Sequence, residues 1–190
     1  MNDSGKNEDL LDELKRISGA ARCLHDGSAI TTAYDHMAVA ITEKLRDSNP
    51  LVLSAMIGGL IPTGHLLTRL QFPLQLDYVH ASRYQGDTRG GELKWLRHPQ
   101  IPLRDRVILI IDDVLDLGIT LRELVAACRR DGARAVYTAV LVEKNNPDRP
   151  GLAQADFTGI KASNEYLYGH GMDYKTYLRN VDGIYAVMES

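Results

Sequence analysis

Short apolar runs alternate with helical stripes along most of this chain. Four runs of strand length end at turn signals, and they cover residues 51–57, 74–81, 106–113 and 135–142. Apolar side chains at helical spacing predict helices over 8–17, 31–47, about 63–70 and 121 to near Gly132. Strands that alternate with helices imply right-handed βαβ units around a mostly parallel sheet. We therefore predict an α/β fold in which helices flank a central sheet.

The stripes also predict which side chains are buried and where the helices begin. Residues 8–17 and 31–47 each carry one stripe, formed by Leu10, Leu11, Leu14 and Ile17 and by Met37, Ala40, Ile41 and Leu45. Thr31 and Thr32 are capping-type residues at the start of the second stripe. Pro62 suits the first turn of the third helix. Two further short strands are expected, at 156–160 and 183–187.

The apolar run Val107–Ile111 is followed at once by two carboxylates, Asp112 and Asp113. An unbroken apolar run predicts a parallel strand buried on both faces, so its polar end lies where open α/β sheets bind ligands. A third carboxylate, Asp116, opens a short loop that reaches Thr120 and leads into a helix. Backbone N–H groups and the helix dipole favour a phosphate at such a loop. Carboxylates beside a phosphate cradle indicate sugar hydroxyls and a divalent metal ion.

This stretch resembles the phosphoribosyl pyrophosphate signature of the type I phosphoribosyltransferases. The family pattern is an apolar strand, two acidic residues, two apolar residues and Asp-Thr-Gly-x-Thr, and Leu117 departs from it because Thr is usual there. The resemblance implies the family's fold with a small hood, and binding of phosphoribosyl pyrophosphate. It places the 5′-phosphate on the backbone of Asp116, Leu117, Gly118, Ile119 and Thr120. Leu117 has no hydroxyl to donate a hydrogen bond, so it is expected to weaken binding of phosphoribosyl pyrophosphate without abolishing activity.

Two glycines follow the first core strand, in the sequence Ile57-Gly58-Gly59. Glycine lets backbone N–H groups approach an oxyanion closely, and the resemblance makes this segment the pyrophosphate loop. Family members often hold the peptide bond before the first Gly in cis. Some members also carry Lys where this chain has Ile57, so position 57 acts here only through its backbone.

Residues 82–94 are polar and contain several glycines, which predicts a long loop or a flexible hairpin. The family has a mobile loop at this place that closes over the reacting sugar, typically with a small or basic residue followed by Tyr. Arg83 and Tyr84 match that pair. Closure of such a lid would exclude water from a cation-like transition state.

Two segments carry residues that purine-specific members use to bind the base. Lys144 stands in a Lys-x-x-Pro context, and the matching Lys of those members donates to a 6-oxopurine. An ammonium group only donates, so it favours an oxo group over an amino group. The segment 166–180 resembles the end of hypoxanthine-guanine phosphoribosyltransferases, where an aromatic stacks on the base, the next residue's backbone meets the purine edge, an Asp reaches a second metal and an Arg reaches pyrophosphate. These positions are Tyr166, Leu167, Asp173 and Arg179.

The resemblance implies a purine-salvage transferase that depends on Mg²⁺. It would move 5-phosphoribosyl from phosphoribosyl pyrophosphate to N9 of hypoxanthine or guanine, giving IMP or GMP and pyrophosphate. Asp112 and Asp113 would hold the ribose hydroxyls directly or through Mg²⁺, with Asp173 as a further metal ligand. Asp116 would lie near N7 of the base as general base or proton acceptor.

Two alternatives stay open from the sequence. One is an RNA-binding transcriptional regulator on the same fold, which usually carries an aromatic residue in place of Asp116 and needs a basic surface. The net charge of −3 does not indicate such a surface. The other is a xanthine phosphoribosyltransferase, because the residues that would read an extra 2-oxo group cannot be placed from the sequence. Lys144 and the C-terminal motif argue against adenine.

Composition is ordinary for a globular protein, with 44% hydrophobic and 25% charged residues among 190. We expect one domain over 1–190, in which the N-terminal helix and the C-terminal segment form a base-binding hood. No apolar stretch approaches membrane-spanning length and the N-terminus lacks a signal-peptide pattern, so a cytoplasmic location is expected. No nucleic-acid or membrane partner is expected, and homodimers and homotetramers are common in the family. Cys23 and Cys128 are expected to be reduced and buried.

Overall fold

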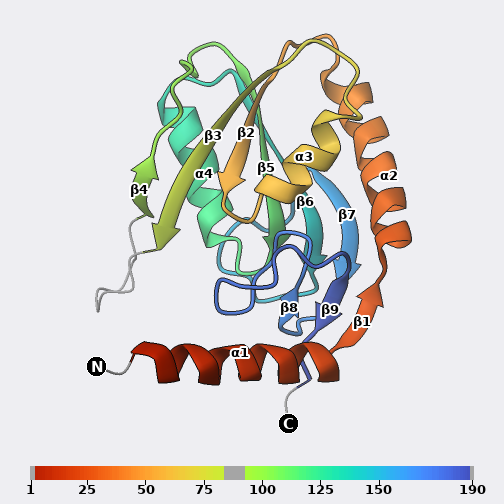
Figure 1. Cartoon of the computed structure of the whole chain (residues 1–190). Helices are drawn as coiled ribbons and strands as arrows, with labels where there is room; N and C mark the ends of the chain where they lie inside the picture. The colour runs from red at the N-terminus through yellow and green to blue at the C-terminus, as the bar shows by residue number, and fades with distance from the viewer. Residues whose placement is uncertain (1–2, 84–92, 189–190) are drawn as a thin grey trace.

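The central element is a six-stranded sheet with the strand order β4-β3-β2-β5-β6-β7 (Figure 1). The computed structural model describes residues 3–83 and 93–188. The strands are β2 (Leu51–Met56), β3 (Gln75–Arg83), β4 (Leu93–Arg97), β5 (Val107–Leu115), β6 (Ala135–Lys144) and β7 (Phe157–Ala162). Neighbouring strands from β3 to β7 run parallel, and β4 lies antiparallel at one edge. The predicted mostly parallel sheet is confirmed.

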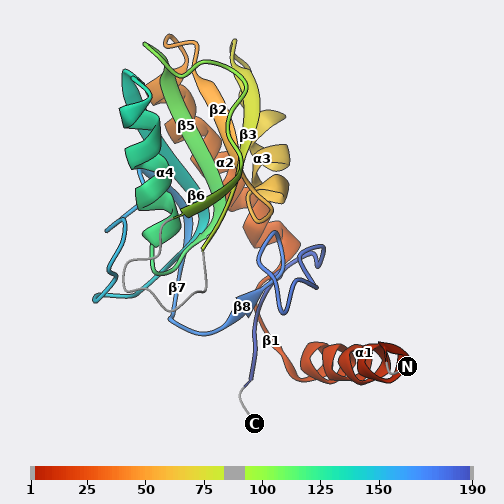
Figure 2. The same ribbon diagram turned by 90° about the vertical axis from the view of Figure 1, so that its left-hand side faces the viewer.

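Helices cover both faces of this sheet (Figure 2). The helices α2 (Gly27–Leu45) and α3 (Leu60–Leu67) pack on one face, and α4 (Ile119–Arg130) packs on the other. Alternate residues of β5 enter the two cores, Leu109 on the α2 side and Ile110 on the α4 side, and both are fully buried. The unbroken apolar run is therefore a strand buried on both faces, as predicted.

The order in which strands are added to the sheet changes direction between the neighbouring strands β2 and β5. The connection from β2 leads outward through α3 to β3, while the connection from β5 leads through α4 to β6 on the other side. Ligands in open α/β sheets bind at such a switch point, outside the carboxyl ends of the strands. This topology places the segments after Met56 and after Leu115 next to each other, at the same end of the sheet.

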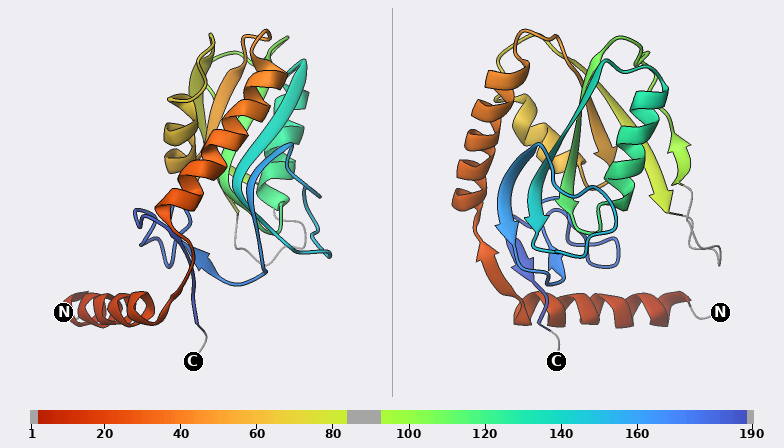
Figure 3. Two further views of the ribbon diagram at one scale, coloured as in Figure 1. Left: turned by 90° about the vertical axis from the view of Figure 1, so that its right-hand side faces the viewer. Right: turned by 180° about the vertical axis from the view of Figure 1, so that it is seen from behind.

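A second, three-stranded sheet lies beyond that end, with the order β1-β9-β8 (Figure 3). It joins β1 (Arg22–His25) to β8 (Leu167–Tyr168) and β9 (Ile184–Ala186), and all of its pairs are antiparallel. Helix α1 (Asp3–Ala20) runs alongside this small sheet, and it buries Leu14 and Ile17. Residues near the two ends of the chain therefore meet at the carboxyl edge of the main sheet.

Helix α2 begins four residues before the predicted start. Asp26 is its N-cap and accepts a hydrogen bond from the Ala29 N–H at 2.9 Å. Thr31 and Thr32 lie inside the helix, where their hydroxyls donate to main-chain carbonyls one turn earlier. The capping role assigned to the two threonines was wrong, because an aspartate upstream already holds the helix start.

Three further expectations need correction. Ala40 is exposed, since the buried face of α2 includes Tyr34 and Ala38 instead. Leu11 is also exposed, because α1 buries only Leu14 and Ile17 of the predicted stripe. Helix α3 starts at Leu60 and not at Thr63. Cys128 is buried, but Cys23 is exposed, because its neighbour Leu24 is the β1 residue that packs against the core and successive residues of a strand point to opposite faces. In the described part of the chain, no helix combines the length and the apolar character needed to span a membrane.

Candidate functional site

A cavity of about 490 Å³ opens at the carboxyl ends of the central strands, beside the small sheet. It brings together most of the residues that the sequence singled out. Its lining consists of Gly58, Asp112, Asp113, Val114, Asp116, Leu117, Gly118, Ile119, Thr120, Leu121, Lys144, Tyr166, Leu167, Met172, Asp173 and Arg179. The sequence reasoning missed Val114, Leu121 and Met172, because nothing distinguishes them from core residues until the fold is known.

The acidic pair lies within β5, which continues to Leu115 beyond the predicted end at 113. The side chain of Asp112 accepts from the N–H of Asp113 at 2.9 Å, and Asp113 accepts from the N–H of Val114 at 2.7 Å. Burial and the neighbouring Asp113 carboxylate raise the pKa of Asp112 well above its usual range. Burial also raises the pKa of Asp113, although the Arg179 guanidinium opposes this shift. The strand end therefore holds two carboxylates that favour a cation nearby.

Replacing Asp112 by Asn is expected to stabilise the ligand-free protein near neutral pH. A raised folded-state pKa means that ionisation costs stability as pH rises through that pKa, whereas below the ordinary pKa both folded and unfolded chains keep the proton. Asn retains the oxygen that accepts from Asp113. Thermal unfolding without ligands should give a higher Tm for Asp112→Asn near neutral pH, and a smaller difference at about pH 4. A wild-type protein that is more stable than the variant near neutral pH would contradict this account.

Gly58 lies directly against Asp113. A Cβ atom at position 58 would overlap the Asp113 carboxylate, so a larger residue would fit there only if Asp113 moved. The preceding bond between Met56 and Ile57 is a cis peptide, one bond earlier than the bond immediately before Gly58. The Ile57 side chain is 52% exposed and is not part of the cavity lining. These contacts bring the end of β2 against the acidic pair of β5.

The loop from Asp116 to Gly118 leads into α4, whose first two residues are Ile119 and Thr120. Gly118 caps the helix with a φ of 70°, a left-handed conformation that glycine adopts without strain. The first N–H groups of an α-helix have no partner inside the helix, and the helix dipole adds positive potential there. The loop that the sequence predicts as a phosphate cradle therefore leads into a helix start that lines the cavity.

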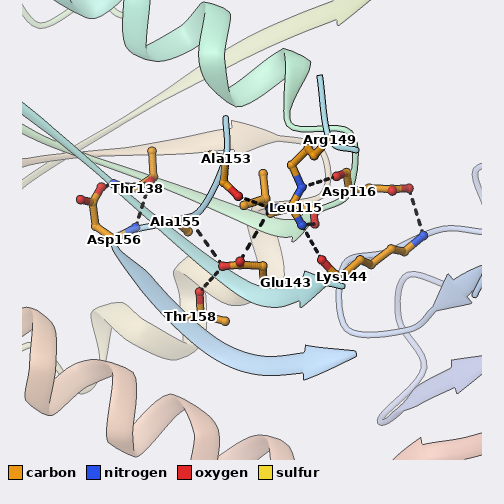
Figure 4. Close-up of polar contacts among 10 residues, drawn as sticks. All are labelled: Leu115, Asp116, Thr138, Glu143, Lys144, Arg149, Ala153, Ala155, Asp156 and Thr158. Atoms are coloured by element: carbon orange, nitrogen blue, oxygen red, sulfur yellow. Dashed lines mark hydrogen bonds and ion pairs between the residues drawn. The ribbon is translucent and has the colours of Figure 1, made fainter. Parts of the chain in front are cut away.

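Lys144 and Asp116 both line the cavity, and their side chains point toward each other (Figure 4). Lys144 ends β6, and its Nζ donates to Asp116 Oδ2 at 3.0 Å. The Lys144 side chain is 10% exposed, while that of Asp116 is 42% exposed and reachable from the cavity. A donor-only group and an acceptor-only group thus stand side by side.

The C-terminal segment brings Arg179 between two of the predicted metal ligands. Arg179 Nη2 lies 2.7 Å from Asp173 Oδ1, and Arg179 Nη1 lies 3.7 Å from Asp113 Oδ2. Among the residues that the structure describes, no three His, Cys, Asp or Glu side chains gather as a metal-binding group. Asp112, Asp113 and Asp173 thus do not form a ready-made cage.

Helix α1 reaches the same segment through Glu13. The Glu13 carboxylate accepts from the Tyr174 hydroxyl at 2.7 Å and from Lys175 Nζ at 2.7 Å. The Tyr174 ring in turn packs edge-on against Tyr166, with 5.6 Å between the ring centroids. Tyr166 is half exposed and lines the cavity, whereas Leu167 is buried in β8. The first helix therefore supports the predicted base-stacking residue through one intervening ring.

The predicted lid falls largely outside the described residues. Arg83 is the last residue of β3, which pairs with β4 as an antiparallel hairpin, so the hairpin alternative was the correct one for the described ends of this segment. Tyr84 and the rest of the segment to residue 92 lie outside the described residues.

The chain belongs to the phosphoribosyl transferase domain family, whose profile matches residues 21–165. The hypoxanthine-guanine-xanthine phosphoribosyltransferase of Tritrichomonas foetus is 25% identical over 181 residues, covering 95% of this chain and 96% of that protein. The hypoxanthine-guanine phosphoribosyltransferase of Bacillus subtilis is 29% identical over 142 residues, covering 74% and 78%. A solved hypoxanthine phosphoribosyltransferase from Staphylococcus aureus has the same fold, with a TM-score of 0.82, 21% identity, and coverage of 88% and 91%. The expected family and fold are confirmed.

Proposed function

We propose that this chain transfers the 5-phosphoribosyl group of phosphoribosyl pyrophosphate to N9 of hypoxanthine or guanine, forming IMP or GMP and releasing pyrophosphate. The observation that carries the proposal is the pair of Lys144 and Asp116, 3.0 Å apart in a cavity that also holds a phosphate-type loop. Membership of the family and the names of the two relatives agree with it.

The Lys144–Asp116 pair matches one edge of a 6-oxopurine. O6 and N7 are neighbours on that edge, so Lys144 can donate to O6 while Asp116 accepts a proton from N7. As the N9–C1′ bond forms and the bond from C1′ to pyrophosphate breaks, the base must lose this proton. Asp116 would take this proton as the general base. Tyr166 would stack on the base, and the Leu167 backbone would meet its far edge.

The other end of the cavity suits the donor. The backbone of residues 117–120 would hold the 5′-phosphate at the start of α4. Asp112 and Asp113 would hold the ribose hydroxyls, while Ile57 and Gly58 through their backbones and Arg179 through its guanidinium would contact pyrophosphate. This role of Arg179 is supported by its position in the cavity lining, near both Asp113 and Asp173.

The acidic residues of the site suit an Mg²⁺ ion that binds together with phosphoribosyl pyrophosphate. Mg²⁺ prefers oxygen ligands and is usually held by one or two carboxylates together with substrate phosphates. Asp112 and Asp113 supply such oxygens, and their raised pKa values reflect a site that disfavours uncompensated negative charge. Asp173 would join once Arg179 turns toward pyrophosphate. The bound ion would neutralise charge on the leaving group.

Metal dependence separates this enzyme from a regulator that only keeps the fold. Activity should be lost in excess chelator and return with Mg²⁺ or Mn²⁺, both oxygen-seeking ions. Asp173→Ala should raise the Mg²⁺ concentration for half-maximal rate several-fold, with a smaller effect on Tm, because Asp173 lines the cavity and not the core. Asp182→Asn, which changes an exposed carboxylate of the same segment, is the control. Full activity in excess chelator would defeat the metal-assisted mechanism, and tight RNA binding without turnover would favour the regulator.

The proposal also includes a base-binding hood, an oligomeric state and a cellular location. We place α1 and the segment from Tyr166 onward in a base-binding hood, which agrees with the contact between Glu13 and Tyr174. A homodimer or homotetramer in the cytoplasm is expected, with a purine base and phosphoribosyl pyrophosphate as ligands and no nucleic-acid or membrane partner.

A further inference from the structure

Arg149 is a buried cation that lies behind the proposed site. Its side chain is 4% exposed, and it is not part of the cavity lining. It sits in the connection between β6 and β7 and reaches between the loop after β5 and the end of β6 (Figure 4). A buried guanidinium requires partners for its charge and its N–H groups, and those partners indicate what it does.

The Arg149 guanidinium donates to main-chain carbonyls on both sides of the site. Nε donates to Asp116 O at 2.6 Å, and Nη2 donates to Leu115 O at 3.3 Å and also to Lys144 O. Nη1 donates to Ala153 O at 2.5 Å, within its own connection. One planar group therefore ties the backbone of Asp116 to the backbone of Lys144.

The residues after Arg149 extend this support along the loop. The N–H of Gly151 donates to Leu117 O at 3.0 Å, and the N–H of Leu152 donates to Gly118 O at 2.9 Å. Together with Arg149, they hold four consecutive carbonyls, those of residues 115–118. The C=O and N–H of one peptide unit point in opposite directions. Fixing these carbonyls therefore turns the N–H groups of residues 116–119 away from this support.

The positive charge of Arg149 is balanced by the carboxylate of Glu143. Glu143 Oε1 lies 3.7 Å from Arg149 Nη1, and its carboxylate accepts from the Thr158 hydroxyl at 2.8 Å and the Ala155 N–H at 3.4 Å. A buried ion pair whose other hydrogen-bonding groups also have partners is rigid and geometrically specific. The support behind the loop is thus a fixed network.

We propose that Arg149 is a positioning residue for the transfer reaction, and the proposal rests on the function given above. By holding the Asp116 and Lys144 backbones together, it sets the spacing of the two groups that read a 6-oxopurine. By holding the Asp116 carbonyl, it also sets the orientation of the donor loop. Lysine cannot replace it, because an ammonium group lacks the planar fork that reaches several carbonyls at once.

The test compares Arg149→Lys and Arg149→Met with Thr138→Val. Thr138 anchors the other end of the same connection, where its hydroxyl donates to Asp156 Oδ2 at 3.0 Å, and it lies outside the cavity. Thr138→Val thus controls for loss of a buried contact in this connection. For each variant, Tm, the KM for phosphoribosyl pyrophosphate, and kcat/KM with hypoxanthine and with adenine are measured.

Both Arg149 variants are expected to lose about tenfold to a hundredfold in kcat/KM with hypoxanthine, the scale on which residues that orient metal ligands affect activity. The KM for phosphoribosyl pyrophosphate should rise, and the ratio of hypoxanthine to adenine turnover should fall about tenfold or more. Thr138→Val should lower Tm while leaving KM and this ratio unchanged. If Arg149→Met does not fold, Arg149→Lys decides the matter.

An unchanged KM and an unchanged base ratio in Arg149→Lys would overturn the positioning role, as would equal kinetic losses in Thr138→Val at matched Tm. Failure of the proposed function gives a different result, because wild-type protein would then not turn over hypoxanthine at all. The same assay therefore separates the two failures.

Discussion

Asp116→Asn is expected to lower kcat roughly 10²-fold or more, the usual scale for a general acid–base group. Asn can still accept the hydrogen bond that Lys144 donates at 3.0 Å, so the local geometry should survive. It cannot take a proton from N7 of the base. The donor loop should bind as before, because the backbone of residues 117–120 is unchanged, and the KM for phosphoribosyl pyrophosphate should change far less than kcat.

Steady-state rates with hypoxanthine at saturating donor and Mg²⁺ measure this effect. Asp148→Asn is a matched control, since it changes an exposed carboxylate near the same loop and outside the cavity. It should keep the wild-type kcat. A kcat for Asp116→Asn within a few-fold of wild type would remove Asp116 from the chemistry and leave the carboxylate as a partner of Lys144 only.

Base choice should depend on Lys144. Wild-type protein should prefer hypoxanthine and guanine to adenine by about 10⁴-fold in kcat/KM. With adenine, the buried Lys144 ammonium would face the 6-amino group, which cannot accept its hydrogen bond. The Lys144 side chain is 10% exposed, so water cannot easily satisfy it in place of O6. Lys144→Gln should lower kcat/KM for hypoxanthine by about 10²-fold or more and narrow the preference over adenine, because an amide can both donate and accept.

Competition between hypoxanthine and adenine in one reaction gives the ratio of the two kcat/KM values directly. Lys161→Gln is the control, because it removes an exposed ammonium from the neighbouring strand β7. Efficient use of adenine by the wild-type protein would overturn the role of Lys144 and the assignment to the 6-oxopurine branch. An unchanged ratio of the kcat/KM values for hypoxanthine and adenine in Lys144→Gln would mean that other residues determine the choice of base.

The strands β2, β5 and β6 at the centre of the sheet could be predicted because they are largely apolar runs of strand length, which indicate a buried strand before any tertiary contact is known. Val107–Ile111 is the clearest case, since burial on both faces requires every residue to be apolar. The small sheet could not be predicted in full. Its strand β1 pairs with residues 184–186, more than 150 positions away, and a short strand gains its stability from such partners.

The cavity could be predicted where a motif carries its own chemistry, as Asp112, Asp113 and Gly118 do. Arg149 could not be, because an arginine in a polar connection looks like a solvated surface residue. Its burial depends on the carbonyls that the loop after β5 presents to it. Arg179 could be predicted as a site residue from the C-terminal motif, but its contacts with Asp113 and Asp173 could not, because they arise from the path of the C-terminal segment.

The most direct test of the central claim is product analysis with purified wild-type protein, phosphoribosyl pyrophosphate, Mg²⁺ and each of hypoxanthine, guanine, xanthine and adenine. We expect IMP from hypoxanthine and GMP from guanine, each linked through N9 and accompanied by an equal amount of pyrophosphate, and no AMP from adenine. Turnover of xanthine alone would assign the protein to a xanthine enzyme. No nucleotide from any of the four bases would contradict the account.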